Sequence, residues 1–208
     1  MKQLTLLLVL GISLSLCNLT NKLREAGKSG DSNKAAPVAS GADVERPQPT
    51  AAQLAALAGG QDVRWDRQGM SWSVPPNWVK ATEEEKTFLW RSPGSWDAAS
   101  LIVSISPMDE SFPVEISLNA YYDQTMTRAK NGEVDETRWL EIDGVKGVQF
   151  RESNPEKPDD QRRLQWLAYR NYGGQVQMVN LMLATRGKDF ARHQDAMYGI
   201  LYSTKLDH

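Results

Sequence analysis

Apolar and polar residues alternate in the stretch VRWDRQGMSWSVPPNW, residues 63–78, and this alternation predicts a hairpin. A period of two along the chain is typical of a strand with one buried face. If residues 68 and 69, Gln and Gly, form a two-residue loop, Trp65 lies opposite Trp72. The hairpin ends at residues 75 and 76, because both are prolines and lack the N–H that a continuing strand donates.

Other stretches predict further strands and two helices. KTFLWRS and SLIVSIS predict strands, and the nearly continuous apolar run of the second suits a strand covered on both faces. Between Val114 and Lys130 apolar residues recur every three or four positions, which predicts an amphipathic helix. RWLEIDGVKGVQF predicts a hairpin that turns at Asp143 and Gly144. Two long strands, LQWLAYRNY and QVQMVNLMLAT, precede a closing helix with Phe190 on its apolar face.

This order of elements predicts an α+β fold, with a mostly antiparallel β-sheet flanked by helices. The predicted domain spans residues 61–208, about 150 residues, which is long enough to bury its own core. Residues 17–60 are rich in Ala, Gly, Ser and Pro and predict a flexible low-complexity tether. Within it, a short helical turn from Thr50 to Leu57 is favoured, because Thr caps helices and Ala and Leu form them well.

Residues 1–16 carry an early positive charge and then an uncharged apolar run, which predicts a signal peptide for export. The run is shorter than the ~20 apolar residues that cross a membrane. Cys17, the only cysteine of the chain, follows directly, so no internal disulfide is available. Its position predicts the lipid attachment site of a lipoprotein bound to a membrane. Leu14 and Ser15 match bacterial lipoprotein signals, whereas Leu16 departs from them. The alternative is cleavage after Ser15, which releases a soluble secreted protein.

Charge and residue types argue against several functions. A net charge of −2 and a pI near 5.8 disfavour a nucleic-acid partner. The only histidines are His193 and His208, no Gly-x-Ser-x-Gly motif occurs, and no Cys or His spacing fits a metal site. Two acidic runs, residues 83–85 and 159–160, are expected at the solvated surface. We therefore expect no catalytic residue, no metal and no cofactor, and a protein that is not an enzyme.

The seven tryptophans are the compositional feature that points to recognition. Five of them alternate with polar residues in predicted strands, where they fill the faces of a sheet. Trp78 and Trp96 instead lie in predicted turns beside Pro and Gly, where side chains are more often exposed. Exposed indoles serve as contact points for proteins and sugars, so Trp78 and Trp96 are the candidate contacts for a partner or ligand.

Several stretches resemble the PsbP-like family, which has the Mog/PsbP αβα-sandwich fold. They are GMSWSVPPNW, FLWRSP, SLIVSISP, YGGQVQMVNLML and DFARHQDAMYGILYSTKL, and the resemblance covers about residues 61–206. The family includes extrinsic photosystem II subunits, periplasmic and lipid-anchored bacterial proteins, and cytoplasmic chaperones of secreted effectors. The export signal departs from the last group. The resemblance implies a non-catalytic accessory domain that binds a protein in the cell envelope. The alternative is a lipoprotein that binds a glycan or small molecule through exposed aromatics.

The lipid anchor can be tested at Cys17. We expect Cys17→Ser to be exported but no longer bound to membranes, because the acceptor thiol is lost. Metabolic labelling with a clickable palmitate measures the modification. Wild-type protein that takes up no label and has a mature N-terminus at Leu16 would contradict the lipoprotein interpretation.

Overall fold

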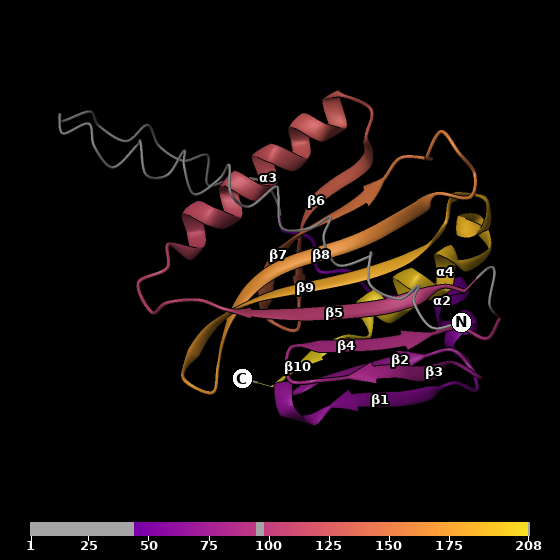
Figure 1. Cartoon of the computed structure of the whole chain (residues 1–208), viewed down its shortest axis with the longest axis horizontal. Helices are drawn as coiled ribbons and strands as arrows, with labels where there is room; N and C mark the ends of the chain where they lie inside the picture. The colour runs from indigo at the N-terminus through magenta and orange to yellow at the C-terminus, as the bar shows by residue number, and fades with distance from the viewer. Residues whose placement is uncertain (1–43, 95–97, 208) are drawn as a thin grey trace, which may run out of the picture. The chain divides into compact units, whose positions relative to one another are not determined.

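A computed structural model describes residues 44–94 and 98–207, and all of them belong to one compact unit. Its centre is a seven-stranded antiparallel sheet, the large sheet (Figure 1). In spatial order its strands are β3 (Val79–Glu83), β4 (Thr87–Arg91), β5 (Ser100–Pro107), β9 (Gln175–Arg186), β8 (Gln161–Tyr172), β7 (Val145–Glu152) and β6 (Val134–Ile142). A small sheet contains β1 (Gln61–Trp65), β2 (Met70–Val74) and β10 (Lys205–Leu206).

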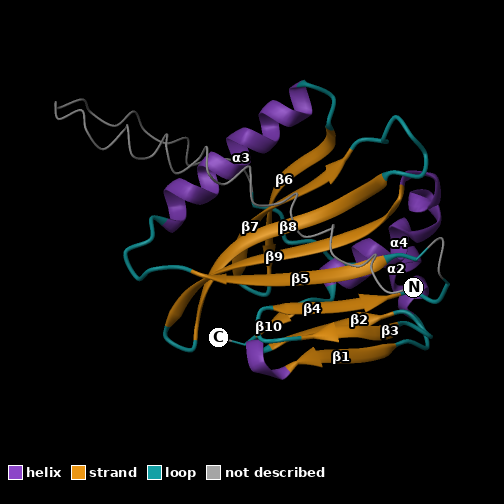
Figure 2. Ribbon diagram, in the orientation of Figure 1, coloured by secondary structure: helices purple, strands orange, loops and turns teal. Residues whose placement is uncertain are grey.

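Three α-helices and two 3-10 turns complete the described part of the chain. The helices are α2 (Ala51–Leu57), α3 (Val114–Lys130) and α4 (Phe190–Tyr202), and the turns are η1 (Asp66–Gln68) and η2 (Gly187–Asp189) (Figure 2). The predicted α+β fold, with a mostly antiparallel sheet and flanking helices, is confirmed.

Local signals placed two elements correctly. The predicted helix is α3, which begins at Val114 and ends at Lys130. The predicted hairpin turn has positive φ angles at Asp143 (49°) and Gly144 (82°), as a type I′ turn requires. The flanking residues pair as this turn dictates, with Ile142 opposite Val145.

The predicted register of the first hairpin is wrong by two residues. Trp65 pairs with Met70 rather than with Trp72. The reason is that η1 and Gly69, which has a left-handed φ of 53°, form a four-residue connection in place of a two-residue loop. A shift of two leaves every side chain on its predicted face, so both tryptophans are still buried.

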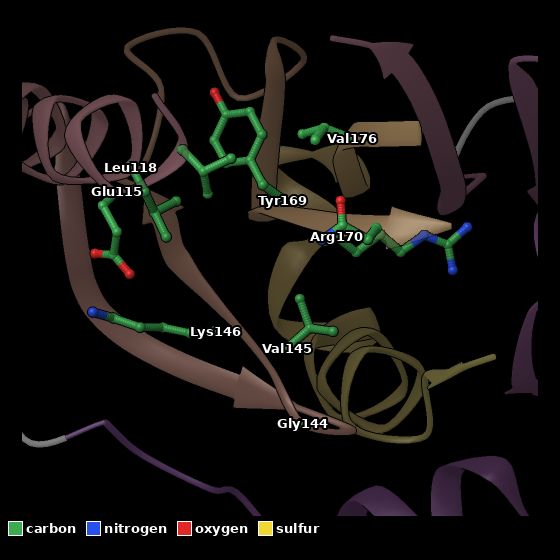
Figure 3. A pocket seen from close by; sticks show the side chains of 10 residues that line it. Glu115, Leu118, Gly144, Val145, Lys146, Tyr169, Arg170 and Val176 are labelled. Carbon is green, nitrogen blue, oxygen red and sulfur yellow. The ribbon is translucent and has the colours of Figure 1, made fainter. Parts of the chain in front are cut away.

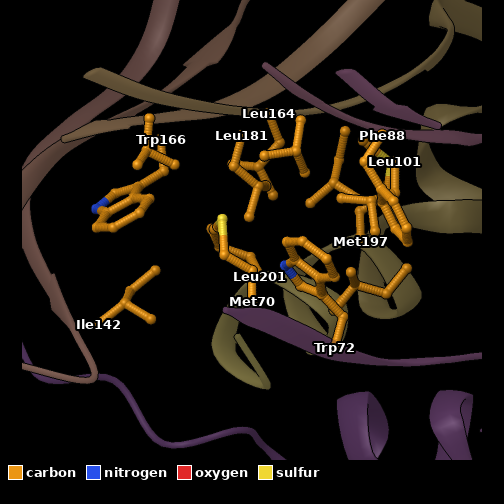
Figure 4. Packing of buried hydrophobic residues seen from close by; sticks show 14 of the residues in the cluster. Met70, Trp72, Phe88, Leu101, Ile142, Leu164, Trp166, Leu181, Met197 and Leu201 are labelled. Atoms are coloured by element: carbon orange, nitrogen blue, oxygen red, sulfur yellow. The ribbon is translucent and has the colours of Figure 1, made fainter. Parts of the chain in front are cut away.

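The two faces of the large sheet are buried differently. On one face, α3 packs over β6, β7 and β8 around a cluster of Leu118, Trp139, Val148 and Leu167. The opposite face holds the main core, which lies between the large sheet, the small sheet and α4. Figure 4 shows side chains of the large sheet, such as Leu181, meeting Trp72 of β2 and Met197 of α4.

The predicted tether is wrong for residues 44–60, because these residues belong to the domain. The Glu45 N–H donates to the Trp139 carbonyl at 3.0 Å, and the Glu141 N–H donates to the Glu45 carbonyl at 2.8 Å. Arg46 adds two hydrogen bonds of 2.8 Å to the Glu141 carboxylate. These contacts cover the outer edge of β6. They involve backbone and charged groups, which leave no apolar pattern in the sequence.

The predicted helical turn of the same segment is α2, capped by the Thr50 side chain. It packs on α4, and its Leu57 contacts the main core. A Cβ on Gly199 of α4 would lie 3.0 Å from the Gln53 carbonyl oxygen, so glycine permits this close approach. The domain therefore includes residues 44–60, whereas residues 1–16 and 17–43 lie outside the described residues.

The expected exposure of Trp78 is also wrong. Trp78 is 4% exposed and belongs to the main core. Asn77, with a φ of 64°, completes the turn after the two prolines and returns the chain toward the core. The Gln61 amide also donates to the Trp78 carbonyl at 2.9 Å, which joins this turn to β1. A turn at the surface thus directs its aromatic side chain inward.

Trp78 and its neighbour Val79 provide a matched test of this burial. Trp78→Ala should lower the free energy of unfolding by about 3–5 kcal/mol, because it removes a buried aromatic side chain. Val79→Ala should lower it by less than about 1 kcal/mol, because Val79 is 48% exposed. Urea denaturation measures both. Equal, small losses would mean that the Trp78 side chain is exposed in solution.

Candidate functional site

The large sheet carries a row of apolar side chains that belongs to neither hydrophobic cluster. Leu89 of β4 pairs with Ile102 of β5, and Ile102 pairs with Met182 of β9. All three are half-buried, and neither cluster includes them. Because side chains alternate along a strand, they point away from the main core, into which the adjacent Leu101 and Leu181 point. We call Leu89, Ile102 and Met182 the outer row.

The outer row lies on the same side of the sheet as α3, but α3 does not reach it. α3 packs on β6, β7 and β8, and none of the described helices packs closely on β3, β4 or β5 (Figure 2). Beside the row, Val79 of the edge strand β3 is 48% exposed. Sheets usually bury an apolar face against another layer. Here the layer covers only part of the face.

The row next to the outer row carries two arginines and continues past Arg91 to Val79 of β3. Along it, Arg163, Ala184, Ser100 and Arg91 are paired across β8, β9, β5 and β4. The Arg163 guanidinium contacts the Glu152 carboxylate at 3.0 Å and remains 42% exposed. Arg91 is exposed, and no carboxylate of the described residues pairs with it. The Arg91 guanidinium therefore places an exposed positive charge beside the apolar strip, whereas the charge of Arg163 is matched by that of Glu152.

The other border of the outer row is polar and uncharged. Asn180, Ser104 and Thr87 are paired across β9, β5 and β4 there. Among the side chains that β3, β4, β5 and β9 direct to this face, none is Asp or Glu. The surface offers apolar contact, hydroxyl and amide groups, and cations. Groups of these kinds can bind a partner.

A second feature is an open cleft of about 350 Å³ at the N-terminus of α3 (Figure 3). Its walls are the start of α3, the turn between β6 and β7, and the adjoining ends of β8 and β9. The Glu115 carboxylate and the Lys146 amine point to the same side of the cleft, and the Arg170 guanidinium points away from them. Lys146 Nζ lies 4.3 Å from the centre of the Trp139 ring.

Two other titratable groups line the cleft, the Tyr169 hydroxyl and the Arg170 guanidinium. Burial raises the pKa of Tyr169, so its hydroxyl is neutral at physiological pH. Arg170 is 6% exposed and stacks on the Tyr172 ring at 4.4 Å. Its Nε donates to Gln177 Oε1 at 3.3 Å. The cleft therefore presents one amine, of Lys146, and one carboxylate, of Glu115.

A third feature is a network of charged side chains between α4 and the strands β6 and β7. The Tyr198 hydroxyl donates to Glu136 at 2.6 Å, and Arg138 and Arg151 contact the same carboxylate at 3.0 and 3.2 Å. Burial is the largest cause that raises the pKa of Tyr198. Arg151 also pairs with Asp135 at 2.6 Å. Since these groups satisfy one another, the network holds α4 on the sheet and leaves no charge to a ligand.

Of the predicted contact residues, the structure describes only Trp78, which does not lie in the outer row. Cys17 and Trp96 lie outside the described residues, and Trp78 is buried in the main core. His193 is half-buried on α4, as expected of a residue at the edge of the core. Among the described residues, no group of three His, Cys, Asp or Glu side chains could hold a metal ion. No described helix has both the length and the apolar character needed to cross a membrane.

One sequence feature, the apolar run of β5, already indicated the outer row, but it was interpreted as a strand buried on both faces. The run LIVSI of β5 predicts burial on both faces, and the structure covers only the face of Leu101, Val103 and Ile105. Ile102 is the one apolar residue of this run on the opposite face, and it belongs to the outer row. Its neighbours Leu89 and Met182 come from distant segments, so only the strand pairing reveals the patch.

This chain is similar to known proteins in structure but not in sequence. No protein-family model matches the chain, and no curated protein matches it in sequence. Among solved structures, LpqN of Mycobacterium tuberculosis, described as involved in cell envelope biogenesis, is 13% identical. The match covers 72% of this chain and 86% of LpqN, with a TM-score of 0.52.

Two further structures are similar at lower scores. CyanoP, the cyanobacterial PsbP of Synechocystis sp. PCC 6803, is 13% identical over 71% of this chain and 92% of CyanoP, with a TM-score of 0.46. A protein of Bacteroides thetaiotaomicron VPI-5482 is 12% identical over 72% of this chain, with a TM-score of 0.44. That match spans only 49% of the Bacteroides protein. The predicted PsbP-like fold is confirmed, and at these identities the likeness concerns the fold alone.

Proposed function

We propose that this chain is an exported lipoprotein whose PsbP-like domain is a non-catalytic accessory module that binds a protein partner in the cell envelope. The observation that carries the proposal is the outer row. Leu89, Ile102 and Met182 form a continuous apolar strip on the part of a sheet face that no described helix covers. Apolar strips of this kind at a protein surface mark sites of association.

The geometry favours a protein over a small ligand. The outer row runs across three paired strands, so it presents a broad face rather than an enclosed cavity. Small-molecule sites are usually concave and bury most of their ligand. A protein partner instead covers an extended surface with an apolar centre and a polar rim. The outer row with its rows of hydroxyl, amide and guanidinium groups has this pattern.

The location rests on the N-terminal sequence and on one structural relative. The apolar run before Cys17 is typical of an export signal, and the single cysteine at its end favours a lipid anchor. LpqN, which has a similar fold, is described as involved in cell envelope biogenesis. These two observations support a place in the cell envelope, with a soluble secreted protein as the alternative.

The structure supports the glycan-binding alternative less well than the sequence did. It relied on Trp78 and Trp96 as exposed aromatics, and Trp78 is only 4% exposed. A buried indole offers no stacking surface to a sugar. We therefore favour a protein partner.

Mild crosslinking in membranes of cells that express the full chain tests the proposal. Wild-type protein should be recovered with one stoichiometric protein partner. Leu89→Asp should reduce the recovery about tenfold or more, because it places a charge in the apolar strip. Leu54→Asp is the matched control, since Leu54 of α2 is 57% exposed and lies outside the outer row.

Circular dichroism must show that both variants fold. Equal recovery from wild type, Leu89→Asp and Leu54→Asp would contradict a role for the outer row. Recovery of no protein, together with binding on a glycan array, would replace the proposal by the glycan alternative.

A further inference from the structure

We infer that the outer row receives an amphipathic helix of the partner, which lies beside α3 and carries a carboxylate on the flank that meets Arg91. This inference rests on the proposed function and adds the chemistry of the partner. It follows from three observations: the width of the uncovered face, its continuity with the α3 layer, and its charge.

The uncovered face has the width of one helix. The outer row crosses β4, β5 and β9, which are two strand spacings of about 4.8 Å each, or about 10 Å in all. The diameter of an α-helix with its side chains is about 10–12 Å. One helix therefore covers Leu89, Ile102 and Met182 together.

The incoming helix continues an existing layer. α3 packs on β6, β7 and β8 of the same face, and its centre lies three strand spacings from β5, about 14 Å. Packed helices lie about 8–10 Å apart, so a second helix fits on the sheet without displacing α3. Addition of a strand at the free edge is less favourable, because β3 has only five residues and is interrupted by a register shift between Lys80 and Thr82.

The charge of the face selects an acidic helix. Arg91 of β4 is exposed, and Ser100, its neighbour across β5 in the same row, has a small side chain. This small side chain leaves room for a carboxylate to approach the Arg91 guanidinium. The Arg163 guanidinium is already paired with Glu152 at 3.0 Å, whereas no Asp or Glu of β3, β4, β5 or β9 points to this face and competes for Arg91, although the chain as a whole has a net charge of −2. Charge complementarity therefore favours Asp and Glu on that flank of the partner.

A photo-crosslinking amino acid at position 102 of the full chain, activated in membranes, tests the inference. Mass spectrometry then identifies the partner segment joined to this position. We expect a segment with apolar residues at spacings of three and four, and with Asp or Glu on one side. The yield of adduct should fall about tenfold in Arg91→Glu, because reversal of the charge repels the carboxylates.

Arg67→Glu is the matched control. Arg67 is exposed in η1 and undergoes the same change of charge outside the large sheet. The melting temperature of both variants should equal that of the wild type. Loss of the adduct in Arg91→Glu alone, together with an acidic amphipathic segment in the adduct, supports the inference.

Other results separate this inference from the proposed function. A protein adduct with the same yield in Arg91→Glu, or a partner segment without carboxylates or without helical spacing, would overturn the acidic helix and leave partner binding intact. An adduct with lipid or glycan only, or no adduct, would overturn both.

Discussion

A stack of three aromatic rings joins the two sheets of this domain. Phe88 of the large sheet lies between Trp65 and Trp72 of the small sheet, with ring centres 5.5 and 5.1 Å apart. All three side chains are buried, and removal of large aromatic side chains from such positions costs several kcal/mol. The stack fixes which face of β4 points inward, and the pairing of β4 with β5 and β9 transmits that choice across the sheet.

The outer row is a consequence of this choice. Once Phe88, Leu101 and Leu183 face the small sheet and α4, the intervening residues Leu89 and Ile102 must face the other side. Of the described helices, only α3 covers that side, and it packs on the far strands β6, β7 and β8. The arrangement that stabilises the domain therefore also places an apolar strip beyond the reach of α3, where we propose that a partner binds.

The fold could be predicted from the sequence where its cause is local. Periodicity placed α3, and the Asp143–Gly144 pair fixed the register of its hairpin, because both depend on neighbouring residues. Trp78 was predicted to be exposed because the prolines before it indicate a turn. A turn signal predicts where the backbone reverses, but it does not predict where the side chain packs. The contacts of Glu45 with β6 were missed since backbone hydrogen bonds have no sequence signature.

The central claim is that one strand, β5, has a core face and an opposite face on which no described helix covers Ile102. Urea denaturation of Leu101→Thr and Ile102→Thr tests it directly, because threonine is tolerated in strands and both changes introduce the same hydroxyl group. Leu101 is fully buried, so we expect Leu101→Thr to lower the free energy of unfolding by about 3 kcal/mol or more. Ile102→Thr should lower it by about 1 kcal/mol or less. Equal losses for the two variants would show that Ile102 belongs to a core, and would contradict the account.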